Sequence, residues 1–191
     1  MGAMPATQRM TAEEFLALPE TRQLARAELV AGELIVHEPA LLHQHVLGRL
    51  FAAFDRWTSA RSGRGTVTLP LDVRIDHRNV FAPDLLWYSR SAAPGVHAAR
   101  PYPLPSLAVE VRSPSTWRYD VGSKMATYER AGLQELWLVD TAASEVLVFR
   151  RSAPAAPEFD VALELERGDT LSSPQLAGFE LRLGAVFPPP E

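Results

Sequence analysis

The sequence predicts an α/β fold in which a mixed central sheet is flanked by helices. Residues 41–60 carry apolar side chains at the 3.6-residue period of an α-helix. Residues 66–76 alternate between apolar and polar side chains, which is the pattern of a strand with one buried face. A second helix is predicted over residues 117–131, ended by Gly132, with strand-like segments on both sides of it. Strands interrupted by helices in this order favour helices packed on a sheet.

Local signals predict the remaining elements. Thr11 and Glu14 form a capping box, which opens a short helix that runs to Leu18 and ends before Pro19. Ala31-Gly32 predicts the turn of a hairpin between residues 26–30 and 33–37. Further strands are predicted over residues 80–88, 107–112, 135–140, 145–150 and 159–166, the last of them at a sheet edge. Residues 179–187 are expected to be a partly packed tail.

The length of 191 residues predicts one domain, because single cores usually serve about 100–200 residues. We expect residues 1–9 to be a disordered N-terminal segment, residues 10–187 to form a single domain, and residues 188–191 to be a disordered tail. No apolar run approaches the roughly 20 residues that span a bilayer, and residues 1–10 lack the layout of a secretory signal. The expected location is the cytoplasm, with no membrane partner.

Composition excludes several classes of function. There is no cysteine, so disulfides, thiolate nucleophiles and zinc–cysteine clusters are excluded. The net charge of −4 at pH 7 argues against avid, nonspecific nucleic-acid binding, in which lysine and arginine displace counterions from phosphates. A local basic cleft stays open as an interpretation, because Arg56, Arg61 and Arg64 form one cluster, although a solvated surface explains it as well.

Two acidic residues lie in or beside apolar segments, where burying a carboxylate is energetically unfavourable. Glu110 lies in the apolar segment Leu107-Ala108-Val109-Glu110-Val111, and a buried carboxylate is usually paired, protonated or bound to a metal. Asp84 follows Pro83, which suits a bulge or a strand start and can aim a carboxylate at a ligand. The simpler alternatives are an edge strand with Glu110 in solvent, and a turn formed by Pro83-Asp84. As a pair on neighbouring strands, the two carboxylates can share a hard divalent cation such as Mg²⁺.

Lys124 is the next candidate for this site. It lies three residues after Val121 and four before Tyr128 in the predicted helix, so the three side chains should project from one side. If that side faces the sheet, the lysine can reach towards the carboxylates. The alternative is an Asp120–Lys124 pair on a solvated helix face, which would contribute only about 0.2–0.5 kcal/mol.

Glu28 and His43 are weaker candidates. Glu28 stands among apolar neighbours in the first hairpin and is a candidate third acid. His43 opens the long helix, where it is either a site residue or a histidine that packs or caps. A metal pair with His45 is disfavoured, because residues two apart do not face each other on a helix.

The order of these residues resembles the Uma family, a bacterial branch of the restriction-endonuclease-like, or PD-(D/E)XK, nuclease superfamily. The resemblance covers residues 10–150, and the run from Glu110 to Asp140 is its most distinctive part. The matching segments are Pro83-Asp84, Glu110-Val111-Arg112-Ser113-Pro114-Ser115-Thr116, Asp120, Lys124, Tyr128, Ala131-Gly132-Leu133 and Glu135-Leu136-Trp137-Leu138-Val139-Asp140. The early hairpin, Glu28-Leu29-Val30-Ala31-Gly32-Glu33-Leu34, and His43 match as well.

The resemblance implies a restriction-endonuclease-like fold and metal-dependent hydrolysis of phosphodiester bonds, with DNA as the expected substrate. Mg²⁺ or Mn²⁺ would be bound by Asp84 and Glu110, with Glu28 as a further candidate, and would lower the pKa of a bound water. The expected catalytic residues are Asp84, Glu110, Lys124, Glu28 and His43.

The sequence departs from the superfamily at its usual lysine, two residues after the glutamate. Arg112 occupies that position, and Lys124 in the following helix would instead orient the water or stabilise the transition state. Lys124 could act as a base only if burial and positive neighbours depressed its pKa. Arg112 and Arg118 are expected to bind the substrate.

Other functions were weighed against the nuclease. A catalytically inactive nuclease-fold module that binds nucleic acid or a protein partner is favoured by the negative net charge and by the missing lysine after Glu110. A metal-dependent enzyme acting on a small molecule is disfavoured, since no phosphate-binding glycine loop or cofactor fingerprint is present. A homodimer is expected, because the superfamily often pairs to cut two strands and residues 133–139 and the C-terminal strands offer apolar edges.

Overall fold

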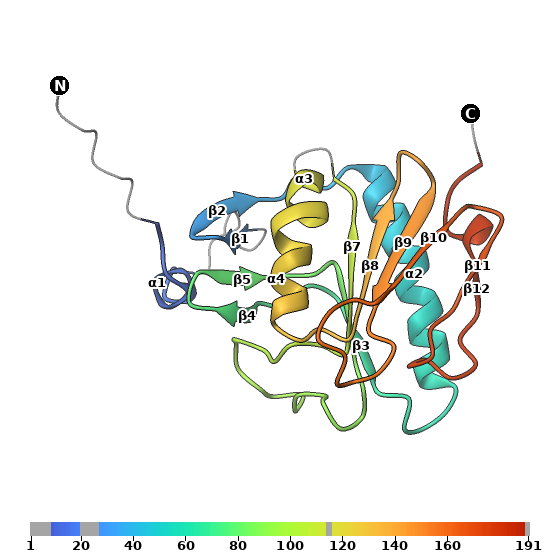
Figure 1. Ribbon diagram of the computed structural model, residues 1–191, viewed down its shortest axis with the longest axis horizontal. Helices are drawn as coiled ribbons and strands as arrows, with labels where there is room; N and C mark the ends of the chain where they lie inside the picture. The colour runs from blue at the N-terminus through green and yellow to red at the C-terminus, as the bar shows by residue number, and fades with distance from the viewer. Residues whose placement is uncertain (1–8, 20–26, 114–115, 190–191) are drawn as a thin grey trace.

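The structure, a computed structural model, describes residues 9–19, 27–113 and 116–189 (Figure 1). A six-stranded sheet forms its centre, in the order β10-β9-β8-β7-β6-β3. Its strands are β3 (Thr66–Thr68), β6 (Leu85–Tyr88), β7 (Leu107–Val111), β8 (Glu135–Asp140), β9 (Glu145–Arg150) and β10 (Val161–Leu165). β7 and β8 are parallel and the other neighbours are antiparallel, so the sheet is mixed, and β10 lies at its edge as predicted.

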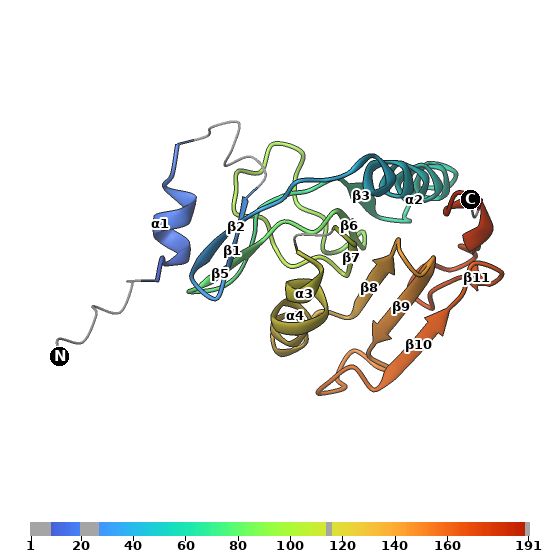
Figure 2. The ribbon, with the colours of Figure 1, turned by 90° about the horizontal axis from the view of Figure 1, so that it is seen from above.

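Helices cover both faces of this sheet (Figure 2). On one face, the apolar stripe of α2 (Leu41–Ser59) packs on the sheet through side chains that include Leu50 and Phe54. On the other face, Tyr128 of α4 (Met125–Arg130) packs with Ala108 and Leu136. Because side chains alternate along a strand, each central strand supplies residues to both layers. The predicted α/β class is confirmed.

A second, four-stranded sheet lies beside the first, in the order β2-β1-β5-β4. Its strands are β1 (Ala27–Val30), β2 (Glu33–Val36), β4 (Val73–Asp76) and β5 (Asn79–Phe81). The predicted hairpin joins β1 to β2 through Ala31 (φ 50°) and Gly32 (φ 80°), the left-handed pair that a two-residue hairpin turn requires. The predicted capping box of Thr11 and Glu14 opens α1 (Ala12–Leu16), which packs against this sheet. Residues 1–8, 190–191 and the predicted strand start at residue 26 lie outside the described residues.

Two segments that were predicted as single strands each divide between the two sheets. Residues 66–76 form β3 in the six-stranded sheet and β4 in the four-stranded sheet, with Pro70 between them. Residues 80–88 form β5 and β6, which Pro83 separates in the same way. Proline cannot donate to a strand ladder, so both breaks fall where pairing ends and the chain passes from one sheet to the other. The second break is the one that exposes Asp84 at the start of β6.

The helix predicted over residues 117–131 is interrupted. It consists of α3 (Trp117–Tyr119), a π-helical turn η2 (Asp120–Lys124) and α4. The wider turn changes the phase of the helix, so Val121 is 41% exposed, and the expectation that it projects from the same side as Lys124 and Tyr128 is wrong. Asp120, Lys124 and Tyr128 point inward instead. Single π-turns of this kind are often found at functional sites.

The C-terminal segment packs on the α2 layer, as expected. It contains β11 (Thr170–Leu171), β12 (Leu181–Arg182) and the 3₁₀ turn η3 (Leu183–Ala185), and Phe179, Val186 and Phe187 are buried in the core. No helix among the described residues is both long and apolar enough to cross a bilayer.

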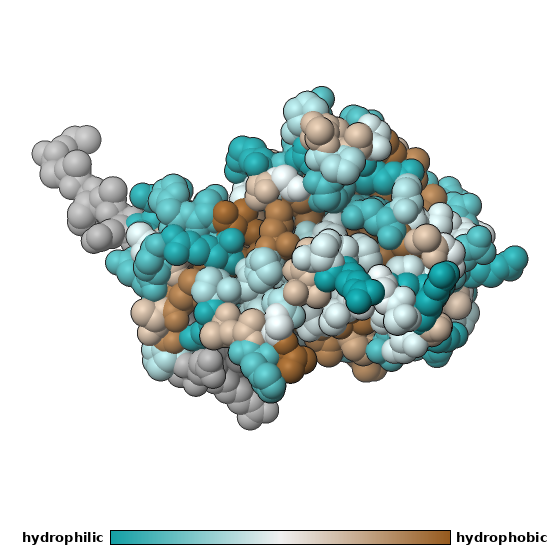
Figure 3. Space-filling view, turned by 90° about the horizontal axis from the view of Figure 1, so that it is seen from below, coloured by the Kyte–Doolittle hydropathy of each residue, from teal (hydrophilic) through white to brown (hydrophobic). Residues whose placement is uncertain are grey.

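Of the two apolar edges that were expected to support a homodimer, the one at residues 133–139 is not at the surface. Leu133, Trp137 and Val139 are completely buried, because β8 lies between β7 and β9 rather than at an edge. On the face shown in Figure 3, hydrophobic residues instead lie in separate patches among hydrophilic ones.

Candidate active site

β6 and β7 bring Asp84 and Glu110 together. Leu85 and Val109 are paired across these strands, and the two acids are the next residues outward. The backbone N–H of Val111 donates to Asp84 Oδ2 at 2.7 Å, which holds the aspartate against β7. The Glu110 side chain is only 3% exposed, so the alternative of an edge strand with this acid in solvent is wrong.

Glu28 reaches the same place from the other sheet. Its carboxylate is almost completely buried, and it accepts the backbone N–H of Ala82 and a hydrogen bond from the His37 ring. Lys124 Nζ lies 3.0 Å from both oxygens of Glu28. The hairpin and the helix after β7, far apart in the chain, therefore meet at one ion pair.

Lys124 is the centre of the group. Its ammonium lies 2.8 Å from Glu110 Oε1 and 3.2 Å from Asp120 Oδ1, in addition to its contacts with Glu28. The predicted Asp120–Lys124 pair thus exists, but it is buried rather than solvated. Lys124 is also the only lysine in the chain, a signal in the sequence that sets it apart from the eighteen arginines. A compact ammonium with three donors suits three converging carboxylates better than a planar guanidinium does.

The electrostatics of the group are unbalanced, with three buried carboxylates on one ammonium. Burial alone would raise the pKa of Glu28, but Lys124 and His37 outweigh it and hold that pKa at about 2. Burial raises the pKa of Glu110 well above its ordinary value, and Lys124 only partly opposes this. Burial likewise raises the pKa of Asp120. Full ionisation of the group would leave an excess of negative charge, which a proton or an added cation relieves.

The protonation state of Lys124 follows from the same contacts. Burial would lower its pKa, but Glu110, Glu28 and Asp120 outweigh burial and raise that pKa well above 10.5. The condition under which Lys124 could serve as a base, a pKa depressed by positive neighbours, is therefore not met. Lys124 is a fixed positive charge.

Two residues orient the acids of β6 and β7. The Tyr128 hydroxyl donates to Glu110 Oε1 at 2.7 Å, from the next turn of the helix after Lys124. His43 Nε2 lies 3.2 Å from Asp84 Oδ1, so the histidine at the start of α2 is buried beside the site. The prediction that His43 lies near the acids is thus consistent with its position, whereas a role for the Tyr128 hydroxyl was not anticipated.

His37 was not anticipated, although the hairpin pattern contains the signal. Glu28 pairs with Ile35 across the hairpin, and His37 lies two residues further along the same face, within reach of a diagonal contact. Burial lowers the pKa of His37, but its hydrogen bond and charge contact with Glu28 outweigh burial and raise that pKa.

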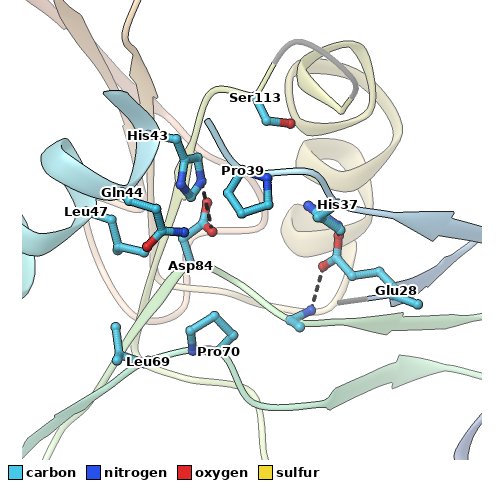
Figure 4. Close-up of a pocket in the computed structure, with 12 residues that line it drawn as sticks. Glu28, His37, Pro39, His43, Gln44, Leu47, Leu69, Pro70, Asp84 and Ser113 are labelled. Atoms are coloured by element: carbon cyan, nitrogen blue, oxygen red, sulfur yellow. Dashed lines mark hydrogen bonds and ion pairs between the residues drawn. The ribbon is translucent and has the colours of Figure 1, made fainter. Parts of the chain in front are cut away.

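A cavity of about 220 Å³ opens beside these residues (Figure 4). Asp84, His43, His37 and Glu28 are among the polar residues that line it. Its apolar side is formed by a set of side chains that includes Pro39, Leu47, Leu69 and Pro70.

Comparison with known proteins assigns the family. The sequence model of the Uma2 family, described as "Putative restriction endonuclease", matches residues 12–184. The chain belongs to the Uma2 family. Its fold is similar to a crystal structure of "a putative nuclease belonging to DUF820" from Anabaena variabilis ATCC 29413, with a TM-score of 0.75. That likeness covers 93% of this chain and 97% of the other at 19% sequence identity. No curated protein matches the chain.

Membership of the Uma2 family and this fold indicate a restriction-endonuclease-like nuclease. Two arginines that were expected to bind its substrate have partners within the protein. Arg112 forms an ion pair with Asp140, at 2.7 and 2.9 Å from the two carboxylate oxygens, and lies over the Trp117 ring. The exposed Arg118 lies over the Tyr119 ring and donates to its hydroxyl.

Restriction-endonuclease-like families generally use a divalent metal ion, and the donor set of this Uma2 protein suits a hard one. Asp84 is 17% exposed at the cavity, and its Oδ2 has a second lone pair beyond the hydrogen bond it accepts from Val111. Within residues 9–19, 27–113 and 116–189, no three acidic or histidine side chains form a ready metal cage. Mg²⁺ does not need one, because it is usually bound by one or two carboxylates, water and substrate phosphate.

Proposed function

We propose that the protein is an endonuclease that hydrolyses phosphodiester bonds, in DNA, with the help of Mg²⁺ or Mn²⁺. The observation that supports this most directly is the convergence of Glu28 and Glu110 on the buried ammonium of Lys124, with Asp84 beside Glu110 across the neighbouring strands. These acids come from three strands in two sheets, and a shared ammonium holds two of them in place.

Asp84 and Glu110 would hold the metal ion. When bound, that ion would lower the pKa of a water molecule and neutralise charge on the phosphate. The raised pKa of Glu110 means that the site favours either a proton or a cation at this carboxylate. Metal affinity should therefore increase as the pH rises, because ionised Glu110 is the form that coordinates.

Lys124 would act as a fixed electrostatic group. It stays protonated, so it can stabilise the negative charge that develops on the phosphate, but it cannot accept a proton from water. Glu28, with a pKa of about 2, is also too weak a base for that step and serves to position the ammonium. Tyr128 and His43 would hold Glu110 and Asp84 in the geometry that binding requires.

A nicking assay on supercoiled plasmid with Mg²⁺ tests the proposal. Wild-type protein should convert the plasmid to the open circle, and Glu110→Ala should abolish the conversion. Glu164→Ala, which removes an exposed acid from the edge strand β10, is the matched control and should retain activity. Nicking that survives Glu110→Ala would come from a contaminant. Bound oligonucleotide without any nicking would instead support the inactive, nucleic-acid-binding module.

We also propose a homodimer, formed through a surface other than residues 133–139. β2 is an edge strand of the four-stranded sheet, and Leu34 and Val36 on it are 41% and 45% exposed. Leu41 at the start of α2 is 87% exposed. Size-exclusion chromatography with light scattering should give twice the chain mass for the wild type and the monomer mass for Val36→Lys. A wild-type monomer would refute the dimer.

A further inference from the structure

Access to the buried acids is restricted to one side. The side chains of Glu28, Glu110 and Lys124 are only 1–3% exposed, whereas those of Asp84 and His37 are 17% and 23% exposed. Asp84 and His37 both line the cavity beside the site (Figure 4). A phosphate that reaches Asp84 must therefore arrive through this cavity.

The cavity is too small for a paired strand and has the wrong lining for a phosphate backbone alone. Its volume of about 220 Å³ lies below the roughly 300–1,000 Å³ of pockets that take drug-sized ligands. Pro39, Leu47, Leu69 and Pro70 give it an apolar wall close to Asp84. A flat ring of the size of one nucleobase fits such a wall, because bases stack on apolar and aromatic side chains irrespective of sequence.

We propose that the substrate enters this site as an unpaired nucleotide, with its base against Pro39, Leu69 and Pro70. This inference rests on the proposed nuclease function and narrows its substrate class. In a duplex the base is stacked and paired, so an enzyme that needs the base in a pocket requires single strands, frayed ends or an extruded nucleotide. The neighbouring phosphate then lies at Asp84 without any movement of the buried acids.

Binding in Ca²⁺ tests the inference without catalysis. The probe is a short fluorescein-labelled oligothymidylate, measured by fluorescence anisotropy, with the same strand paired to oligoadenylate as the duplex form. Leu69→Ser removes part of the apolar wall at an exposed position, 46% exposed, so the variant should fold. Leu163→Ser is the matched control, because Leu163 is 38% exposed on the distant edge strand β10.

The unpaired strand should bind at least ten-fold more tightly than the duplex. Leu69→Ser should weaken binding of the unpaired strand by roughly five-fold or more, the effect of losing about one stacked base, while Leu163→Ser leaves it unchanged. Equal affinity for the two forms, or equal effects of the two variants, would overturn the inference.

Cleavage in Mg²⁺ separates this inference from the proposed function. Faster cleavage of the unpaired strand than of the duplex supports both. Cleavage of the duplex at the same rate leaves the nuclease standing and overturns the unpaired substrate. If neither form is cut by wild-type protein, the proposed function fails, while the anisotropy result still decides whether the cavity takes an unpaired nucleotide.

Discussion

Removal of the Lys124 ammonium should destabilise the protein strongly. Lys124→Met keeps a flexible chain of similar length but leaves Glu28, Glu110 and Asp120 without the cation that contacts all three at 2.8–3.2 Å. Removing one partner of a buried ion pair typically costs about 3–5 kcal/mol, because the remaining charge stays buried and uncompensated. For a chain of this length, that corresponds to a fall in the midpoint of thermal unfolding of roughly 6–20 °C.

The loss should depend on pH. The pKa values of Glu110 and Asp120 are already raised, so in the variant these two acids take up protons readily as the pH falls. The deficit of Lys124→Met relative to wild type should therefore be largest near pH 8 and smaller near pH 5. Thermal unfolding followed by circular dichroism, in the presence of a chelator, measures it at both pH values.

A surface pair supplies the control for this experiment. Arg74 and Glu13 form an ion pair in which the side chains are 39% and 61% exposed, and solvent screening leaves such pairs with little effect on stability. Arg74→Met should shift the midpoint by no more than a few degrees. A Lys124→Met protein as stable as Arg74→Met at pH 8 would refute the view that the ammonium holds the buried acids together.

Four further predictions concern the same group of residues. The two glutamates that share Lys124 should respond oppositely to pH. Glu28, with its pKa lowered to about 2, contributes stability that is present above about pH 4.5 and is lost as the pH falls towards 2. Glu28→Gln should therefore lower the free energy of unfolding by about 3 kcal/mol near neutral pH and by little near pH 2, as measured by urea unfolding. Glu110 has a raised pKa, so stability is lost as the pH rises through that value. Glu110→Gln should therefore be more stable than metal-free wild type near pH 8, with no difference below about pH 4.5, and a destabilised variant at pH 8 would contradict this. Because Lys124 is the only lysine, ¹⁵N-lysine labelling should give a single side-chain signal whose shift remains that of an ammonium above pH 10.5, and a change to the neutral amine at lower pH would show that the acids do not raise its pKa. Tyr128→Phe removes the hydroxyl that donates to Glu110 and should reduce nicking by about ten-fold while leaving the fold intact by circular dichroism; unchanged nicking would exclude a positioning role.

The locations of most elements could be predicted because their signals are local. The hairpin at Ala31-Gly32, the capping box at Thr11 and the apolar stripe of α2 each depend on a few neighbouring residues. The candidate acids stood out for a similar reason, since Asp84 and Glu110 are carboxylates in or beside apolar strands. The family's spacing of Glu110 and Lys124 also pointed to the helix after β7, and that helix does carry the lysine into the site.

Errors arose where pairing between distant segments decided the structure. Residues 66–76 alternate well enough for one strand, but the partners of β3 and β4 belong to different sheets. Val121 fits an α-helical stripe with Lys124, but a π-turn rotates it outward and brings Asp120 inward. A turn of this kind leaves no periodicity in the sequence, since packing of the buried ion cluster stabilises it rather than local propensity.

The sequence by itself determined which residues carry charge into an apolar interior, and through its resemblance to a nuclease family it indicated what such residues are for. Only the tertiary structure decided how those charges act, because the pKa of a buried group depends on the groups within a few ångströms of it rather than on its neighbours in the chain. Lys124 is surrounded by carboxylates from two sheets and from its own helix, and so it is a permanent cation rather than a base. The cavity beside Asp84 likewise exists only where the hairpin, the start of α2 and the β3–β4 connection meet.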